Sequence, residues 1–383
     1  MEAKKVSNYE LFFDLVFILA TSQLVSILHS TPEHIVSLQE ILEFFVATIG
    51  VWSLWLMENS YLNRYSRRDA NDIYTIIAAA LVIGNMVTLY TTNWRLGIVN
   101  FNGIAIPVYI YYNLLMIVLL GIIILQYLLH IRKYQQCTND MVIQITGIFI
   151  AILIVIVSTV IISFTPVEYI AYIYLITYFA FLIYPTFMTK KMKYSYMNFP
   201  HLVERMQLIT ILTVGELVIA VIKTYPLANQ LLLSVSTFVM VGFLFVSYVS
   251  QTAIGIEHHQ ERVGGPLVYL HIGILIAINI ITAGVEMYYD GQLLEMGSSM
   301  VLVGITLFYV CLFGTSRYNK EGLQMTKQVA MSYFVVYLIG AILAVLFKNN
   351  TLLFFGILAI QSVSMTQVAF HFRKEWIQEN IQF

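Results

Sequence analysis

The stretch HLVERMQLITILTVGELVIAVIK, residues 201–223, predicts a helix that crosses a lipid bilayer. Crossing a hydrocarbon layer of about 30 Å takes about 20 helical residues, and this largely apolar stretch is long enough. It also carries Glu204 and Arg205 near its start and Glu216 deeper inside. Charged side chains are costly in lipid, so such residues normally face a protein interior and find partners there. The stretch therefore indicates one helix of a membrane bundle that has a polar interior.

Eleven further apolar runs of similar length fill the rest of the chain, and the separators between them are too short to hold a soluble domain. We therefore expect an all-α, polytopic membrane protein with about twelve transmembrane helices. The other runs lie near residues 10–29, 38–58, 71–92, 104–129, 141–163, 168–188, 231–254, 266–288, 298–315, 329–347 and 351–370.

The overall composition agrees with this class. Residues of the hydrophobic set make up 59% of the chain and charged residues only 11%, against roughly 25% charged in soluble domains. The net charge of −1 provides no basic surface for nucleic acid, so we expect no nucleic-acid partner. Two cysteines, Cys137 and Cys311, cannot form a disulfide framework. The lipid bilayer is the partner that the composition implies.

The distribution of basic residues predicts the orientation. Lys and Arg favour short cytoplasmic loops. With twelve spans, only Arg95, Lys223 and Lys348 fall in loops on one side, Arg205 lies within a span, and the rest of the 20 basic residues fall on the other side. We therefore expect both termini in the cytoplasm.

The chain divides into two parts of similar length. Residues 1–193 hold six predicted spans and residues 194–383 hold the other six. An even number of spans gives both halves the same orientation, as in parallel repeats. The opening spans, 9–29 and 203–223, align without a gap but share little identity. Duplication and the general likeness of apolar helices both remain open as explanations.

The first span carries two carboxylates on one face. Glu10 and Asp14 are four residues apart, so they lie on the same side of a helix. Asp14 and Arg205 are each about one turn in from the predicted cytoplasmic end of their spans, and we expect them to pair. A helix-pinning ion pair and part of a polar pathway remain alternative roles.

Glu216 lies near the predicted middle of the bilayer, beside Gly215, which leaves room for a neighbouring helix or a water molecule. It is too far along the helix from Arg205 to pair with it. Two interpretations remain open, a proton carrier or a neutral carboxyl group that forms a hydrogen bond between helices.

Four motifs resemble those of the bacterial low-temperature-requirement protein A family and follow one another along the whole chain. They are YELFFDLVFILATSQL (9–24), NRYSRRD (63–69), HLVERMQLITILTVGEL (201–217) and YLHIGILIAINIITAGVE (269–286). The resemblance implies a polytopic protein of the bacterial inner membrane that is linked to growth in the cold. The positions that it marks are Glu10, Phe13, Asp14, Gln23, Arg64, Asp69, His201, Glu204, Arg205, Gly215, Glu216 and His271.

The chain departs from the family pattern at two places. Gln207 stands where glycine is expected, which puts close helix packing there in question. Arg67 and Arg68 stand where acidic or small residues are common in the family. The charge of the loop that holds them is therefore no guide to its role.

The spans and their buried carboxylates favour a proton-coupled secondary transporter or permease for an unidentified small molecule or ion. An ion channel, or a membrane-embedded enzyme acting on lipid or an isoprenoid carrier, is the alternative. The sequence holds no P-loop, GxSxG or HExxH motif, which disfavours an enzyme and gives no catalytic residue, cofactor or metal site. It does not determine the oligomeric state.

Overall fold

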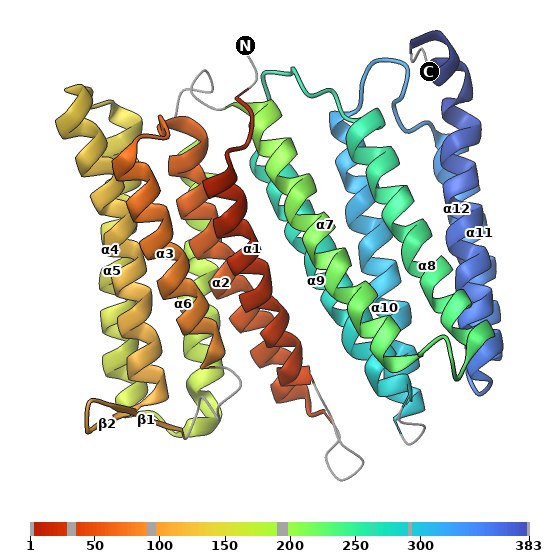
Figure 1. Ribbon diagram of the computed structural model, residues 1–383, viewed down its shortest axis with the longest axis horizontal. Helices are drawn as coiled ribbons and strands as arrows, with labels where there is room; N and C mark the ends of the chain where they lie inside the picture. The colour runs from red at the N-terminus through yellow and green to blue at the C-terminus, as the bar shows by residue number, and fades with distance from the viewer. Residues whose placement is uncertain are drawn as a thin grey trace. The chain divides into compact units, whose positions relative to one another are not determined.

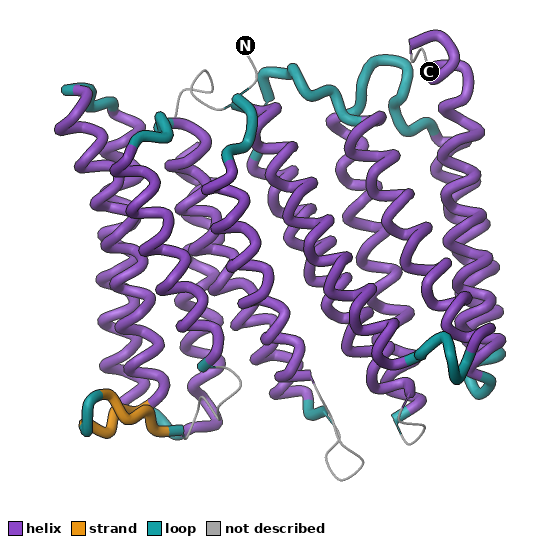
Figure 2. Tube along the Cα trace, in the orientation of Figure 1, coloured by secondary structure: helices purple, strands orange, loops and turns teal. Residues whose placement is uncertain are grey.

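A computed structural model describes residues 4–28, 36–89, 97–189, 198–262, 264–289 and 293–380. Helices make up 83% of the described residues, which contain twelve α-helices (Figures 1 and 2). In this described part of the chain, eleven helical segments are long and apolar enough to cross a membrane, and the sixth helix adds a shorter apolar segment, Ile170–Leu182. The chain is therefore an all-α, polytopic membrane protein, as the sequence predicts.

The chain forms two compact units. Unit 1 comprises Met1–His29, Val36–Arg205 and Glu261–Gly265. Within it, α1 packs on α2 and α3, α3 on α4, α4 on α2 and α5, and α6 on α5 and α2. The helices of this unit are α1 (Asn8–Ser22) with the 3-10 turn η1 (Gln23–Leu28), α2 (Leu38–Arg64), α3 (Ala70–Thr88), α4 (Val108–Tyr134), α5 (Asn139–Ser163), η2 (Val167–Tyr169) and α6 (Ile170–Thr189).

Polar residues fix where these helices begin. Ser7 and Ser37 each cap a helix and form capping boxes with Glu10 and Glu40, which satisfies backbone N–H groups that the first helical turn leaves free. Asp69 caps α3 in a similar way, through a bond from the Asp72 N–H.

A short antiparallel hairpin, β1 (Ile98–Phe101) and β2 (Ile104–Pro107), precedes α4. Asn102 and Gly103 form its turn with φ of 49° and 86°, which is the backbone geometry that two-residue hairpins require. The predicted span 104–129 therefore starts too early, because residues 104–107 pair as a strand and the helix begins at Val108.

Unit 2 comprises Ser30–Ile35, Met206–Gln260 and Pro266–Phe383. The helix α7 starts in unit 1 and continues in unit 2, because the division falls between Arg205 and Met206. Its helices are α7 (Phe199–Thr224), α8 (Leu231–Val249) with the π-helical turn η4 (Ser250–Gly255), α9 (Gly265–Tyr289), α10 (Leu294–Gly314) with η5 (Thr315–Tyr318), α11 (Lys327–Leu346) and α12 (Thr351–Asn380). Whether the halves 1–193 and 194–383 are repeats stays a prediction.

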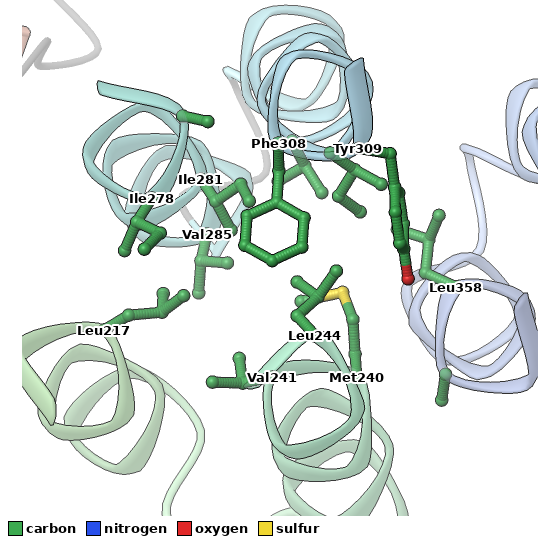
Figure 3. Close-up of a cluster of buried hydrophobic side chains, with 14 of the residues drawn as sticks. Leu217, Met240, Val241, Leu244, Ile278, Ile281, Val285, Phe308, Tyr309 and Leu358 are labelled. Carbon is green, nitrogen blue, oxygen red and sulfur yellow. The ribbon is translucent and has the colours of Figure 1, made fainter. Parts of the chain in front are cut away.

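A large apolar cluster forms the core of unit 2. Figure 3 shows Phe308 of α10 surrounded by residues of α7, α8 and α9, including Leu217, Leu244 and Ile281, with Leu358 of α12 beside Tyr309. Among the candidate membrane spans, α9 has the largest share of buried residues and α11 has the smallest. The outward faces of the spans carry exposed apolar side chains, as lipid contact requires.

Glycines bring α9 and α10 into close contact. A Cβ atom added at Gly297 would lie 2.5 Å from the backbone nitrogen of Tyr288, and one added at Gly284 would lie 2.8 Å from that of Val301. Backbone atoms cannot move aside as side chains do, so only glycine fits at these positions. Gly215 differs, because no heavy atom lies within 4 Å of a Cβ added there. Gly215 therefore leaves the room beside Glu216 that the sequence predicts, and no described helix fills it.

Replacing Gly297 with alanine is expected to lower the free energy of unfolding by about 1–3 kcal/mol, because the added methyl group forces α9 and α10 apart. The matched control is Gly215→Ala, which meets open space. Thermal unfolding of both purified variants in the same detergent measures the difference. Equal midpoints for the two variants would contradict this account of the contact.

Candidate functional site: a buried ionic network in unit 1

The first turns of α1 place two carboxylates inside unit 1. Ser7 starts the helix and its backbone N–H donates to Glu10 Oε2 at 2.6 Å. Asp14 follows one turn later on the same face, as the spacing predicts. The side chains of Glu10 and Asp14 are fully buried. Two acidic groups thus lie in the interior of a membrane-spanning helix bundle, where each needs partners.

Arg205, the last residue of α7 that belongs to unit 1, pairs with Asp14. Its Nε–H donates to Asp14 Oδ2 at 3.0 Å, and a terminal N–H donates to Asp14 Oδ1. Trp55 Nε1–H adds a third bond to Asp14 at 2.9 Å, and Asn59 accepts from Arg205 at 2.8 Å. The predicted pairing is confirmed, and its two-pronged geometry is the strong form of an arginine–carboxylate contact.

The second carboxylate contacts a histidine. His201 Nε2 lies 3.3 Å from Glu10 Oε1, and both side chains are fully buried. The other ring nitrogen of His201, Nδ1, lies 3.2 Å from the amide nitrogen of Asn63. The orientation of that amide is set by the backbone of Asn198, whose N–H donates to Asn63 Oδ1 and whose carbonyl accepts from Asn63 Nδ2, each at 2.9 Å.

These contacts fix the tautomer of His201. Asn63 presents an N–H donor to Nδ1, so Nδ1 must be the acceptor and the ring proton must be on Nε2, facing Glu10. A second proton on Nδ1 would place two donors against each other. The motif that begins at His201 is therefore built to hold a neutral imidazole whose N–H faces a buried carboxylate.

The residues just before α1 form hydrogen bonds with α7 and with the end of α2, next to His201 and Glu10. Glu204 accepts a bond from the backbone N–H of Val6 at 3.1 Å. Lys4 Nζ donates to the carbonyl groups of Leu62, at 2.5 Å, and Ser66, at 3.0 Å, where α2 ends. Burial lowers the pKa of Lys4 from 10.5 to about 8, with the charge of Glu10 acting in the opposite direction.

The NRYSRRD loop folds around one carboxylate that sequence reasoning did not single out, Asp72. Tyr61 OH donates to it at 2.6 Å, Ser66 Oγ at 2.9 Å, and the backbone N–H groups of Arg67 and Arg68 at 2.8 Å each. The φ of Arg68 is 60°, which turns the chain so that both N–H groups point at Asp72. Four donors around a carboxylate make this loop a rigid link between α2 and α3.

The charged residues of this loop also reach neighbouring helices. Arg68 lies 3.7 Å from Glu10, and Arg64 lies 4.0 Å from Asp140. Asp69 accepts from Lys133 at 2.6 Å. Slight burial of Asp69 opposes ionisation, but the bonds from Lys133 and from the backbone hold its pKa at about 2. The predicted residues Arg64 and Asp69 therefore form ion pairs at the edge of the buried network, whose centre is Glu10, Asp14, His201 and Arg205.

A fully buried carboxyl group on α2, Glu58, was missed by the sequence analysis. Gln126 Nε2–H of α4 donates to Glu58 Oε1 at 2.8 Å. Glu58 Oε2 and Gln126 Oε1 are buried and have no hydrogen bond in the described residues. Because the predicted span ended at 58, the residue counted as terminal. The helix continues to Arg64, which places Glu58 inside it.

Three predicted residues lie outside the network. Gln23 is exposed at the start of η1. His271 is buried in unit 2, where Nδ1–H donates to the Leu267 carbonyl at 2.9 Å and Nε2 has no hydrogen bond among the described residues. Glu216 is half-buried and forms no ion pair in the described ranges. The described residues also contain no group of three acidic, histidine or cysteine side chains arranged to hold a metal ion.

Replacing Arg205 with methionine is expected to lower the free energy of unfolding by about 3–5 kcal/mol, because it leaves Asp14 buried and unpaired. The double variant Asp14→Leu with Arg205→Met should recover most of that loss. Thermal unfolding in detergent measures both, with Lys133→Met as the control for the more exposed pair with Asp69, which contributes less than about 1 kcal/mol. A double variant less stable than Arg205→Met would contradict this reading.

Lys4 gives a pH-dependent prediction. Its folded pKa of about 8 lies below the ordinary 10.5, so the folded protein binds this proton less tightly than the unfolded chain does. The contribution of Lys4 to stability should therefore be lowest below about pH 8 and rise between about pH 8 and 10.5. Comparing unfolding of the unchanged protein with Lys4→Met across that range isolates the effect. Lys5→Met, at the exposed neighbouring residue, is the matched control.

Comparison with protein-family models matches residues 5–364 of the chain to the bacterial low temperature requirement A protein (LtrA) family. Comparison with curated proteins gives no match. The family match includes all four motifs that carry the resemblance seen in the sequence, and the residues of the network lie within it, except Lys4. Because the match extends over nearly the whole chain, the protein belongs to the bacterial low temperature requirement A family.

Proposed function

We propose that this protein is a proton-coupled secondary transporter or permease of the bacterial cytoplasmic membrane. Its substrate is a small molecule or ion of unidentified class, and both termini lie in the cytoplasm. The name of the family links such proteins to growth at low temperature, and we extend that role to this chain. Ionisable groups inside membrane-spanning helices are costly and most often serve ion or proton pathways. The network of unit 1 is the main support for this proposal.

The observation that carries proton coupling is the contact between Glu58 and Gln126. One oxygen of each side chain lies buried without a donor, while the opposite atoms share a hydrogen bond. A proton on Glu58 Oε2 supplies a donor to this pair and gives a carboxylic acid facing a carboxamide through complementary atoms. Losing the proton removes the donor and leaves two acceptors unsatisfied. Protonation therefore changes the stability of the α2–α4 contact directly.

The charged groups around Glu58 connect it to the rest of the network. Arg205, Asp14 and Asp72 are charged groups that interact electrostatically with it. Tyr61 and Tyr127 are the titratable hydroxyl groups that interact with it from α2 and α4. A change in the pairing of Arg205 with Asp14 thus changes the field at Glu58. In this scheme Asp14 and Arg205 form the gate, and Glu58 binds the proton.

Glu216 is a second proton-carrier candidate, in unit 2. It is half-buried, and it forms no ion pair or hydrogen bond in the described residues. Ionisable groups in membrane-spanning helices most often serve ion or proton pathways, which keeps Glu216 a candidate. A membrane enzyme is less well supported, since Glu10, Asp14 and Arg205 are enclosed and engaged with one another or with neighbouring side chains.

Replacing Glu58 with glutamine is expected to preserve folding and abolish pH-driven flux. The new amide N–H occupies the position of the carboxyl proton and donates to Gln126, but it cannot be released. The assay is metabolite and ion flux into liposomes that contain the purified protein, with an imposed pH gradient. Glu216→Gln is tested beside it, and Glu295→Gln, at an exposed carboxylate, is the control.

Infrared difference spectra of the same samples provide a second readout. The C=O stretching band of a protonated carboxyl group should be present in the unchanged protein and disappear in Glu58→Gln. Full pH-dependent flux in both Glu58→Gln and Glu216→Gln would show that neither residue carries the coupling proton. Absence of any gradient-driven flux in the unchanged protein, across a broad metabolite mixture, would contradict the transporter proposal itself.

A further inference from the structure

Unit 2 contains a cavity of about 260 Å³ at the ends of α8, α11 and α12. Its lining combines polar side chains, among them Gln251, Asn319 and Arg373, with apolar residues of α10 and α11. The residues at the start of α11 also border it, and the N-terminal turn of a helix carries partial positive charge. None of these residues belongs to the ionic network of unit 1.

Arg373 is the charged group of this cavity, and its side chain has no acidic partner among the residues that the structure describes. Only 9% of the residue is exposed. Its guanidinium donates to the Ser250 carbonyl at 2.6 Å, to Ser250 Oγ at 2.7 Å and to Gln251 Oε1. All three acceptors are neutral, and no ion pair involves Arg373 in the described part of the chain. A buried cation without a counterion is costly unless an anion joins it.

The surrounding backbone holds the guanidinium in one position. Ser250 and Gln251 start the π-helical turn η4, a departure from α-helical bonding that often marks functional sites. Gly255 closes the turn, and a Cβ added there would lie 3.3 Å from an Arg373 terminal nitrogen. Asn319 accepts from Gln251 at 2.7 Å, which holds η4 against the segment after α10. The remaining N–H groups of Arg373 are thus oriented before any ligand arrives.

An apolar groove of about 270 Å³ adjoins this cavity. The groove and the cavity share the lining residues Tyr309, Phe313, Met325 and Tyr333, so the two spaces are neighbours along α10 and α11. Apart from Thr306 and tyrosine hydroxyls, the groove is lined by apolar side chains. Two of them, Val310 and Phe334, are 62% and 58% exposed on faces that lie among lipid chains.

We infer that these two spaces form a binding site for an anionic amphiphile. A phosphate or carboxylate head group bonds to Arg373, and a hydrocarbon chain lies in the groove between α10 and α11. The head group supplies the missing negative charge, and its planar or tetrahedral oxygens fit the guanidinium N–H groups. The hydrocarbon chain covers an apolar surface that adjoins the charged cavity. The site needs no part of the transport scheme to bind its ligand.

Binding of radiolabelled dodecyl phosphate tests the inference, using the full-length protein in nanodiscs of zwitterionic phosphatidylcholine and empty discs as background. Saturable binding is expected, and Arg373→Gln should weaken it at least about tenfold because the charge-assisted bonds are lost. Lys374→Gln, which removes an exposed cation one residue away, is the matched control and should bind as the unchanged protein does. Equal weakening in both variants would show nonspecific attraction to positive charge and overturn the site.

A second pair of variants tests the groove without touching the polar contacts. Ala330→Trp fills the groove and should weaken binding of dodecyl phosphate, whereas Met331→Trp, at an exposed position outside the groove, should not. This pair keeps the test decisive if Arg373→Gln fails to fold. Equal affinities in Ala330→Trp and Met331→Trp would overturn the groove assignment.

Competition identifies which part of the ligand is recognised. Unlabelled dodecyl phosphate and dodecanoate should displace the label, and dodecyl trimethylammonium should not, because its head group is a cation. Inorganic phosphate should compete much more weakly than dodecyl phosphate. Equally strong competition by inorganic phosphate would show a site for a free anion and overturn the amphiphile. Displacement by the cationic amphiphile would show that Arg373 is only a structural partner of η4.

Discussion

The pair between Asp14 and Arg205 is the interaction on which unit 1 depends. Phe17, Trp52 and Trp55 pack at this level of α1 and α2, with ring centroids 4.7–6.3 Å apart, and all three side chains are buried. In such a medium an isolated charge is not tolerated, so α1 must keep its carboxylate against the guanidinium that α7 supplies. Trp55 donates to Asp14 and Asn59 accepts from Arg205, so these two side chains satisfy hydrogen-bonding capacity that the pair itself does not use.

The same requirement explains which parts of the site were predictable. Asp14 and Arg205 are conspicuous because each interrupts an apolar span at a similar depth, and lipid offers no alternative partner. The family resemblance marked His201 and Glu10 as positions of interest, but nothing in the sequence predicted that they contact each other. This contact depends on how Asn63 meets the backbone at Asn198, and no spacing along the chain encodes that meeting.

The fold was predicted almost completely, because the twelve apolar runs correspond to the twelve helices of the described residues. The errors occur where polar residues continue a helix beyond its apolar part. Hydropathy ended the second span at 58, so Glu58 was overlooked, although the helix extends to Arg64. Arg373 was placed past the end of the last span for the same reason, although α12 continues through it. Hydropathy detects contact with lipid, whereas these side chains contact other helices.

The continuity of α7 has a mechanical consequence. The helix is unbroken from Phe199 to Thr224, so Arg205 in unit 1 and Glu216 in unit 2 are parts of one stiff rod. Eleven residues make about three turns and separate the two positions by about 16 Å along the axis. Twisting or sliding the start of this rod moves Glu216 through the same angle and distance, unless the intervening hydrogen bonds break. Within α7, the backbone hydrogen bonds of a single helix therefore fix the spacing between Arg205 and Glu216.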